Sequence, residues 1–307
     1  MEILTNTIIL IVCFIAIGKG ATWLVDSASK LAKRMGVSEL LIGLTIVAFG
    51  TSAPEFGVTI SAAFRGIGDI SVGNIIGSNI FNLGIILGSV AIIQNLKTTY
   101  TLVYRDGIFL LSGSILAVIF LWDLEMDRIE GIILFLLLFL YLGYLYHERR
   151  ALETVKNTKE FRSKDMALLL FGLAMLLIGS HYLVSSAVKL AKLWGVSEWI
   201  IGATIIAAGT SAPEIATSII ASFRGHHGIS LGNLIGSDIF NLLGVLGLAA
   251  IIHNLPIEIF ARLSLLILIF MVVLVLIFLR TGWVLSRKEG IILVLIGIIR
   301  WTFSFLM

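Results

Sequence analysis

The sequence has 307 residues, of which 58% are hydrophobic and 13% are charged, and its mean hydropathy is +1.06. These values exclude a water-soluble domain and are typical of an integral membrane protein, so we expect a lipid bilayer as its surroundings. The formal net charge of +3 is small and dispersed along the chain, which argues against a nucleic-acid partner. Nothing in the composition implies a protein partner.

Apolar runs that are long enough to cross about 30 Å of hydrocarbon as helices recur along the whole chain. The first run, from Ile8, lacks the basic start and cleavage site of a signal peptide, so it is interpreted as a mature helix. We therefore predict an all-α polytopic membrane protein. Its ten transmembrane helices are centred near residues 15, 50, 83, 112, 137, 176, 209, 241, 270 and 296.

The two halves of the sequence are related by a constant offset. Glu214 follows Glu55 by 159 residues, and roughly six in ten positions of 36–96 match their partners in 195–255. This is an internal duplication. We predict a first five-helix repeat over residues 1–146, a linker over 147–165 and a second five-helix repeat over 166–307.

The distribution of basic residues predicts the orientation of the chain. Each repeat has an odd number of helices, so the second repeat enters the membrane from the opposite side and the repeats are inverted. In this arrangement 15 Lys and Arg residues fall on one side of the membrane and 6 on the other. Because cytoplasmic loops carry the excess of basic residues, we predict that both termini lie outside and that the linker 147–165 is cytoplasmic.

The six residues GTSAPE occur at 50–55 and again at 209–214. A carboxylate near the middle of a membrane costs roughly 3 kcal/mol on insertion scales, so Glu55 and Glu214 are expected to line a cavity or to bind a cation. The proline before each glutamate frees backbone carbonyls about one turn earlier. With the nearby hydroxyls, these carbonyls form a cluster of hard oxygen ligands that suits Ca²⁺ or Na⁺. The hydroxyls belong to Thr51, Ser52, Thr210 and Ser211.

The next predicted helix in each half carries a polar stripe. Asn74, Ser78 and Asn82 are spaced four residues apart and therefore share one helical face. Such a stripe can simply join helices, but its recurrence beside a second membrane glutamate favours the lining of an ion site. Asp238 lies about 100° around the helix from this face, which leaves ion contact and a structural role both open. The stripe recurs at Asn233, Ser237 and Asn241.

GTSAPE, together with GNIIGSNIFN at 73–82 and GNLIGSDIFN at 232–241, resembles the paired alpha repeats of the calcium/cation antiporter superfamily. The alpha-1 motif would span residues 43–88 and the alpha-2 motif residues 202–247. The sodium/calcium exchanger branch is most similar, because proton/calcium exchangers usually carry an acidic residue shortly after the Gly-Asn pair. The potassium-dependent branch has an acid where this chain has Asn82 or Asn241, so the resemblance argues against K⁺ co-transport.

The resemblance implies an antiporter that exchanges Na⁺ for Ca²⁺ by alternating access. Both ions would be transported substrates, and the protein would be no enzyme and carry no prosthetic group. The implied Ca²⁺ ligands are Glu55, Glu214, Thr51 and Thr210. The implied Na⁺ ligands are these four residues and Ala48, Ser52, Ser78, Asn82, Ala207, Ser211, Ser237 and Asn241. Asn74, Asn233 and Asp238 stay possible ligands.

Three other functions stay open on the residues alone. The same fold could couple Ca²⁺ to H⁺, since a membrane glutamate can neutralise itself by taking up a proton. The oxygen ligands could form the filter of a cation channel, although inverted halves with broken helices favour a carrier. An intramembrane hydrolase would need a base beside Ser52 or Ser211, and we find no His or Lys placed to act as one.

Overall fold

The computed structural model describes residues 2–149, 162–196, 205 and 207–303. In this part of the chain, seven helices are long and apolar enough to cross a membrane, and a bent helix pair would make an eighth. The prediction of a mostly helical, multi-pass membrane protein is therefore confirmed. The count of ten helices stays a prediction, because the start of the predicted seventh helix and most of the predicted linker lie outside the described residues.

Apart from the π-helical segment η3, which has no counterpart in the second half, the described helices and strands follow one another in the same order in the two halves. The first half contains α1 (Glu2–Met35), α2 (Glu39–Ile42), η1 (Gly43–Val47), α3 (Ala48–Thr51), α4 (Ala53–Phe64), α5 (Gly68–Phe81), η2 (Asn82–Ile86), α6 (Leu87–Ile93), β1 (Leu96–Lys97), η3 (Leu102–Asp106), α7 (Gly107–Phe120), β2 (Glu125–Met126) and α8 (Arg128–Arg149). The second half contains α9 (Ser163–Leu193), α11 (Ala207–Thr210), α12 (Ala212–Phe223), α13 (His227–Ile239), η6 (Phe240–Leu246), α14 (Gly247–Ile252), β3 (Leu255–Pro256), α15 (Ala261–Arg280), β4 (Val284–Leu285) and α16 (Arg287–Phe303). The η segments are π-helical.

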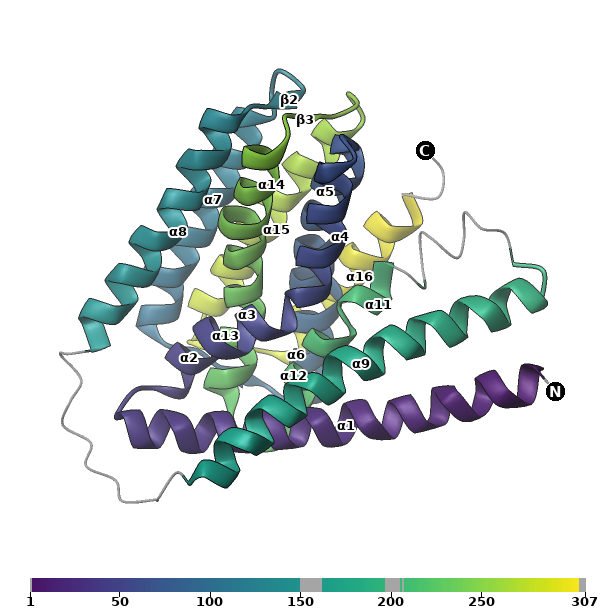
Figure 1. The fold of residues 1–307 in the computed structure, drawn as a ribbon. Coiled ribbons are helices and arrows are strands. Elements are labelled where there is room, and N and C mark those ends of the chain that lie inside the picture. The colour runs from purple at the N-terminus through teal and green to yellow at the C-terminus, as the bar shows by residue number, and fades with distance from the viewer. Residues whose placement is uncertain (1, 150–161, 197–204, 206, 304–307) are drawn as a thin grey trace.

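Helices α1 and α9 lie side by side and cross the upright helices of the bundle at a steep angle (Figure 1). Glycines permit their close contact. A Cβ atom on Gly20 would lie 2.8 Å from the carbonyl oxygen of Gly172, and a Cβ on Gly172 would lie 2.7 Å from that of Gly20. Small residues at such crossings let the backbones of membrane helices approach closely, so α1 and α9 pack as a pair.

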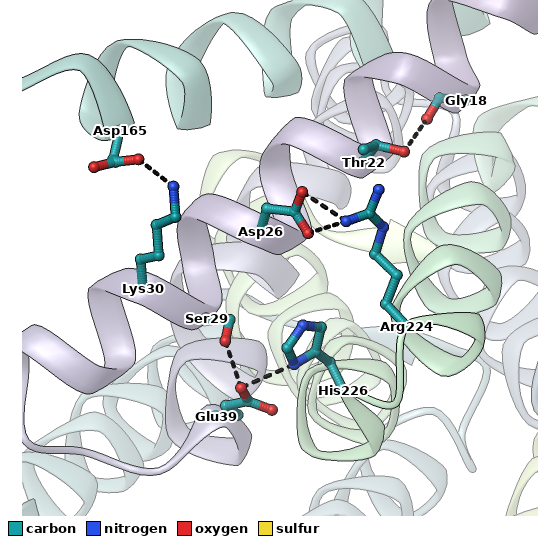
Figure 2. Close-up of polar contacts among 9 residues, drawn as sticks. All are labelled: Gly18, Thr22, Asp26, Ser29, Lys30, Glu39, Asp165, Arg224 and His226. Atoms are coloured by element: carbon teal, nitrogen blue, oxygen red, sulfur yellow. Dashed lines mark hydrogen bonds and ion pairs between the residues drawn. The ribbon is translucent and has the colours of Figure 1, made fainter. Parts of the chain in front are cut away.

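Polar contacts tie the C-terminal half of α1 to its neighbours (Figure 2). Arg224, just after α12, donates two hydrogen bonds to the Asp26 carboxylate, at 2.6 and 2.7 Å. Lys30 pairs with Asp165 of α9 at 2.7 Å. A third contact set joins α1, α2 and the start of α13 through Ser29, Glu39 and His226.

The segment from α2 to α4 is a broken helix. Helix α3 ends at Thr51, and α4 leaves at an angle of 50° to the preceding helix. Pro54 lies in the first turn of α4, where a missing N–H removes no helical hydrogen bond. The second half breaks at the equivalent position, with α11 ending at Thr210 and α12 carrying Pro213 in its first turn. The proline-broken helices that the sequence predicts are therefore present.

Two short antiparallel strand pairs join the halves. Leu96 of β1 faces Leu285 of β4, and Met126 of β2 faces Leu255 of β3. An offset of 159 residues converts Leu96 into Leu255 and Met126 into Leu285, so the second pairing is the counterpart of the first. The two halves thus contact each other through equivalent elements, as expected for a pair related by an approximate two-fold axis.

Large apolar side chains cover the outside of the molecule, and polar side chains lie inside it. Phe139 on α8 and Phe270 on α15 are more than half exposed, as suits helices that face lipid. The buried polar and charged residues gather on α4, α5, α12 and α13 and on the segments next to them. Because burying polar groups in lipid or protein is costly unless they are paired, this polar interior marks the candidate site.

Candidate functional site

Each half places its glutamate in the first turn of the helix that follows the break. Glu55 is the third residue of α4 and Glu214 the third residue of α12, and each side chain is only 1% exposed. Within each half the glutamate helix packs against the next helix, α4 against α5 and α12 against α13. Across the halves, η2 packs against α12 and η6 against α4. The two glutamates therefore lie where the two halves of the protein meet.

The glutamate of the first half is bonded to the second half. The hydroxyl of Ser211 donates a hydrogen bond to Oε1 of Glu55 at 3.2 Å, and the side chain of Thr210 also interacts with this carboxylate. In the reciprocal arrangement Thr51 approaches Glu214, although neither Glu214 carboxylate oxygen has a hydrogen-bond partner among the described residues. Each glutamate is thus approached by the broken segment of the other half, as the sequence leads one to expect if both carboxylates serve one site.

A second group of polar residues joins the break of the first half to α13. The Thr51 hydroxyl lies 2.9 Å from Oδ1 of Asn233 and 3.4 Å from the Ser237 hydroxyl. The backbone carbonyl of Ala48 accepts hydrogen bonds from the Thr51 and Ser237 hydroxyls, at 3.3 and 3.5 Å. The structure therefore brings together three residues that the sequence assigns to ion binding, Ala48, Thr51 and Ser237, and the possible ligand Asn233.

A third group connects the polar stripes of α5 and α13. Asn82 donates to Oδ1 of Asp238 at 2.9 Å, and Asn241 donates to Oδ1 of Asn79 at 3.1 Å. Asn79 in turn donates to the backbone carbonyl of Asp238 at 3.0 Å. All four side chains are at most 1% exposed. Asp238 thus contacts a residue of the polar stripe, although its own position lies off the stripe.

The interior of these helices contains many hydrogen-bond acceptors and few donors. Within the described residues, no ion pair joins Glu55, Glu214 or Asp238 to a basic side chain. Leaving a buried polar atom unpaired costs about 1–3 kcal/mol, and more for a charged group, whereas a bound cation would satisfy several acceptors together. The buried oxygens without a partner in the described part of the protein include Ser52 Oγ, Glu55 Oε2, Asn82 Oδ1, both Glu214 carboxylate oxygens, Asp238 Oδ2 and Asn241 Oδ1.

Other candidate residues contact backbone or lie at the edge of this cluster. Asn74 is half-buried and donates to the backbone carbonyl of Glu55 at 3.2 Å. Ser78 donates to the carbonyl of Asn74 at 2.7 Å, so its hydroxyl oxygen keeps acceptor capacity. Thr210 is half-buried, and Ala207 begins α11.

The oxygen atoms of this site are the kind of ligand that a hard cation prefers. No group of three or more His, Cys, Asp or Glu side chains that could hold a metal occurs among the described residues. An ion here would instead be held by a mixture of carboxylate, hydroxyl, amide and backbone oxygens. Such mixed oxygen sets suit Ca²⁺ and Na⁺, whereas zinc sites use nitrogen and sulfur ligands.

Comparison with known proteins assigns the chain to a family. The profile described as sodium/calcium exchanger protein matches residues 5–147 and 164–306. The protein belongs to the sodium/calcium exchanger family. The sodium/calcium exchanger MaX1 of Methanosarcina acetivorans is 32% identical, over 95% of this chain and 96% of the relative. The putative antiporter CaxA of Alkalimonas amylolytica is 38% identical, over 81% of each.

Solved structures of a sodium-calcium exchanger have the same fold. The structure of NCX_Mj soaked with Na⁺ and Ca²⁺ superimposes with a TM-score of 0.86 at 30% identity, over 96% of this chain and 97% of that one. The structure soaked with neither ion gives a TM-score of 0.88 over 99% of this chain. NCX_Mj and this chain thus share the same arrangement of helices along nearly their whole length.

Several polar residues that are buried around the two repeated motifs were not predicted from the sequence. Thr59 accepts a hydrogen bond from Asn74 at 2.9 Å, and Ser218 interacts with Asn233 at 3.1 Å. These two contacts are equivalent, because Ser218 follows Thr59 by 159 residues. Asn79 was also missed as a contributor. The repeat offset was the available signal, since all three positions carry a polar residue in both halves.

Proposed function

We propose that this protein exchanges Na⁺ for Ca²⁺ across the membrane by alternating access. The observation that carries the proposal is the buried, donor-poor set of oxygens around Glu55 and Glu214 at the contact between the two halves. Two carboxylates can balance one Ca²⁺ or two Na⁺, so ions that use the same oxygens would compete and exchange. In this role both ions are substrates, and the protein catalyses no chemical step and carries no prosthetic group.

We assign the ligands by the chemistry of their oxygens and their placement. Glu55 and Glu214 would bind Ca²⁺ directly, with the backbone carbonyls of Thr51 and Thr210. Na⁺ ions would use overlapping ligands, which explains why one ion can displace the other. The further Na⁺ ligands would be Ala48, Ser52, Ser78, Asn82, Ala207, Ser211, Ser237 and Asn241. Three of these side chains, those of Ser52, Asn82 and Asn241, have a buried oxygen without a partner in the described residues.

The architecture that serves this function is a pair of inverted five-helix repeats, residues 1–146 and 166–307, joined by the linker 147–165. The reciprocal strand pairing of Leu96 with Leu285 and of Met126 with Leu255 supports a two-fold relation between the halves. Inverted halves let one central site open to either side in turn. The excess of basic residues on one side supports a cytoplasmic linker and external termini.

Flux into proteoliposomes tests the proposal. The purified protein should take up radioactive Ca²⁺ when Na⁺ is loaded inside and absent outside, at equal pH on both sides, with the membrane potential clamped. Uptake driven by a pH gradient but not by a Na⁺ gradient would replace Na⁺ with H⁺ as the coupling ion. Uptake that needs no counter-ion would indicate a channel. Either of these two results would overturn Na⁺/Ca²⁺ exchange.

A further inference from the structure

Asp238 is a third carboxylate buried among the helices of the site, and it breaks the symmetry of the two halves. It is 0% exposed and lies on α13, where the equivalent position on α5 is Asn79. Its Oδ1 accepts a hydrogen bond from Asn82, whereas its Oδ2 has no partner in the described residues. Burying an acid with only one side-chain hydrogen bond costs free energy, so a functional role for Asp238 is expected.

The hydrogen bond to Asp238 fixes the directions in which the NH₂ group and the oxygen of the Asn82 carboxamide point. Oδ1 of Asp238 accepts this hydrogen bond, so the NH₂ end of the amide faces Asp238. The amide oxygen of Asn82 must then point elsewhere, and it is buried without a partner among the described residues. Segment η2, which begins with Asn82, packs against the helix of Glu214. Asp238 thus fixes one amide oxygen as an acceptor on the segment next to a site glutamate.

The backbone of Asp238 has a parallel effect on the other half. Its carbonyl oxygen accepts from the NH₂ group of Asn79 at 3.0 Å, so the oxygen of Asn79 is left to accept from Asn241 at 3.1 Å. The oxygen of Asn241 is in turn buried without a partner among the described residues. Segment η6, which carries Asn241, packs against the helix of Glu55. Residue 238 thereby sets the orientation of a ligand amide on each side of the interface, that of Asn82 through its side chain and that of Asn241 through its backbone carbonyl and Asn79.

We propose that Asp238 is a positioning residue, which holds the amide oxygens of Asn82 and Asn241 ready as ligands for the transported cations. This inference rests on the proposed exchange function, because the amide oxygens matter only if cations bind between the halves. Hydrogen-bonded residues behind a ligand orient it and support ion affinity in the same way in other metal sites. The alternative is that Asp238 binds the cation itself through Oδ2.

A double-mutant cycle between Asp238 and Asn82 separates these roles. The variants are Asp238→Asn, Asn82→Ala and the two combined, measured in proteoliposomes for Na⁺-driven Ca²⁺ uptake. Asp238→Asn keeps the side-chain volume, but its amide can present either its oxygen or its NH₂ group to Asn82, so the orientation of Asn82 is no longer fixed. We expect Asp238→Asn to raise the KM for Ca²⁺ about fivefold, with the maximal rate within about twofold of wild type. In the Asn82→Ala background, the same substitution should add less than about twofold, because the amide it orients is gone.

Three results would overturn the inference. A full additional loss from Asp238→Asn in the Asn82→Ala protein would show that Asp238 acts on the ion directly. A lower thermal midpoint of the ion-free protein with an unchanged KM would reduce Asp238 to a structural role. An unchanged KM and midpoint would leave it without a function in the site. If wild-type protein fails to couple Ca²⁺ uptake to Na⁺, the exchange function fails first, so the two failures are distinguishable.

Discussion

Asp26 of α1 and Arg224, just after α12, form a two-bond ion pair that the equivalent residues of the other half cannot make. The position equivalent to Asp26 is Ser185, and the one equivalent to Arg224 is Arg65. A serine and an arginine carry no opposite charges. Helix α1 is therefore held to the bundle by an ion pair. Helix α9 cannot form the equivalent pair, because it has a serine where α1 has an aspartate.

A second ion pair has the same asymmetry. The residues equivalent to Lys30 and Asp165 are Lys189 and Asn6. If the halves were identical, the two conformations that alternating access requires would be equal in energy. Ion pairs on one side favour the conformation in which they form, which is the one described here. Because Asp26 and Arg224 are 36% and 43% exposed, their pair is worth only about 0.5 kcal/mol, or roughly a twofold change in population.

Removal of this pair should loosen the end of α12. We expect Asp26→Asn to speed amide hydrogen exchange of residues 220–224 by about twofold, since the open population rises by that factor. Ser185→Ala, at the equivalent position, is the control and should leave the exchange of this segment unchanged. The charge-swapped protein Asp26→Arg with Arg224→Asp should restore protection. Equal exchange in Asp26→Asn and Ser185→Ala would show that the pair contributes nothing.

Neutralising either site glutamate should stop transport without unfolding the protein. Glu55→Gln and Glu214→Gln keep the side-chain shape and remove one of the two charges that would balance Ca²⁺. We expect a loss of at least about 100-fold in initial Ca²⁺ uptake, equivalent to about 3 kcal/mol of lost interaction. Asp123→Asn, in the loop before β2, is the matched carboxylate control. Normal uptake by both glutamine variants would remove the two residues from the site.

Transported ions should stabilise the protein against heat, because they satisfy buried oxygens that otherwise lack partners. Ca²⁺ at about 100 times its Kd should add about 2.7 kcal/mol to the free energy of unfolding. The measurement is the midpoint of thermal unfolding in detergent, with Ca²⁺ titrated into protein freed of ions by chelation. Mg²⁺ is the control, since its strict octahedral geometry fits a mixed oxygen set poorly. A Glu214→Gln protein stabilised as much as wild type would argue against binding at Glu214.

Much of the site could be predicted because its residue pattern occurs twice in the sequence, once in each half. The repeated proline and glutamate at 50–55 and 209–214 marked both the helix breaks and the buried carboxylates, and the structure has each of them. The four-residue spacing of Asn74, Ser78 and Asn82 placed them on one helical face. These features are local, since they depend on the period of a helix and on the missing N–H of proline.

The contacts between the halves could not be predicted in the same way. That Asn82 bonds to Asp238, and that Thr51 bonds to Asn233, depends on how η2 and α3 meet α13 in space. The steep crossing of α1 and α9 likewise depends on packing between distant segments. A single sequence predicts which residues share a helical face but not which helix that face contacts. The contacts of Asp238 are therefore known only from the structure.

Glycines on α13 should matter far more than their equivalents on α5. A Cβ on Gly236 would lie 2.7 Å from the carbonyl oxygen of Leu44 and 2.8 Å from the Cβ of Ala48. Gly77 is the equivalent residue, and apart from its chain neighbours and the nearby backbone of its own helix, no atom of the described residues lies within 4 Å of a Cβ placed there. Gly236→Ala must therefore push α13 away from η1 and α3, whereas Gly77→Ala needs no movement of the described helices.

The cost of such overpacking is typically about 1–3 kcal/mol. We expect Gly236→Ala to lower the thermal midpoint by roughly 5 °C and to reduce Ca²⁺ uptake, because Ala48 and its neighbours in the break move with η1. Gly77→Ala should keep both properties within error of wild type. Size-exclusion chromatography after heating, followed by flux measurements, reports on both. Equal midpoints for the two variants would mean that α13 does not pack against the broken helix as closely as described.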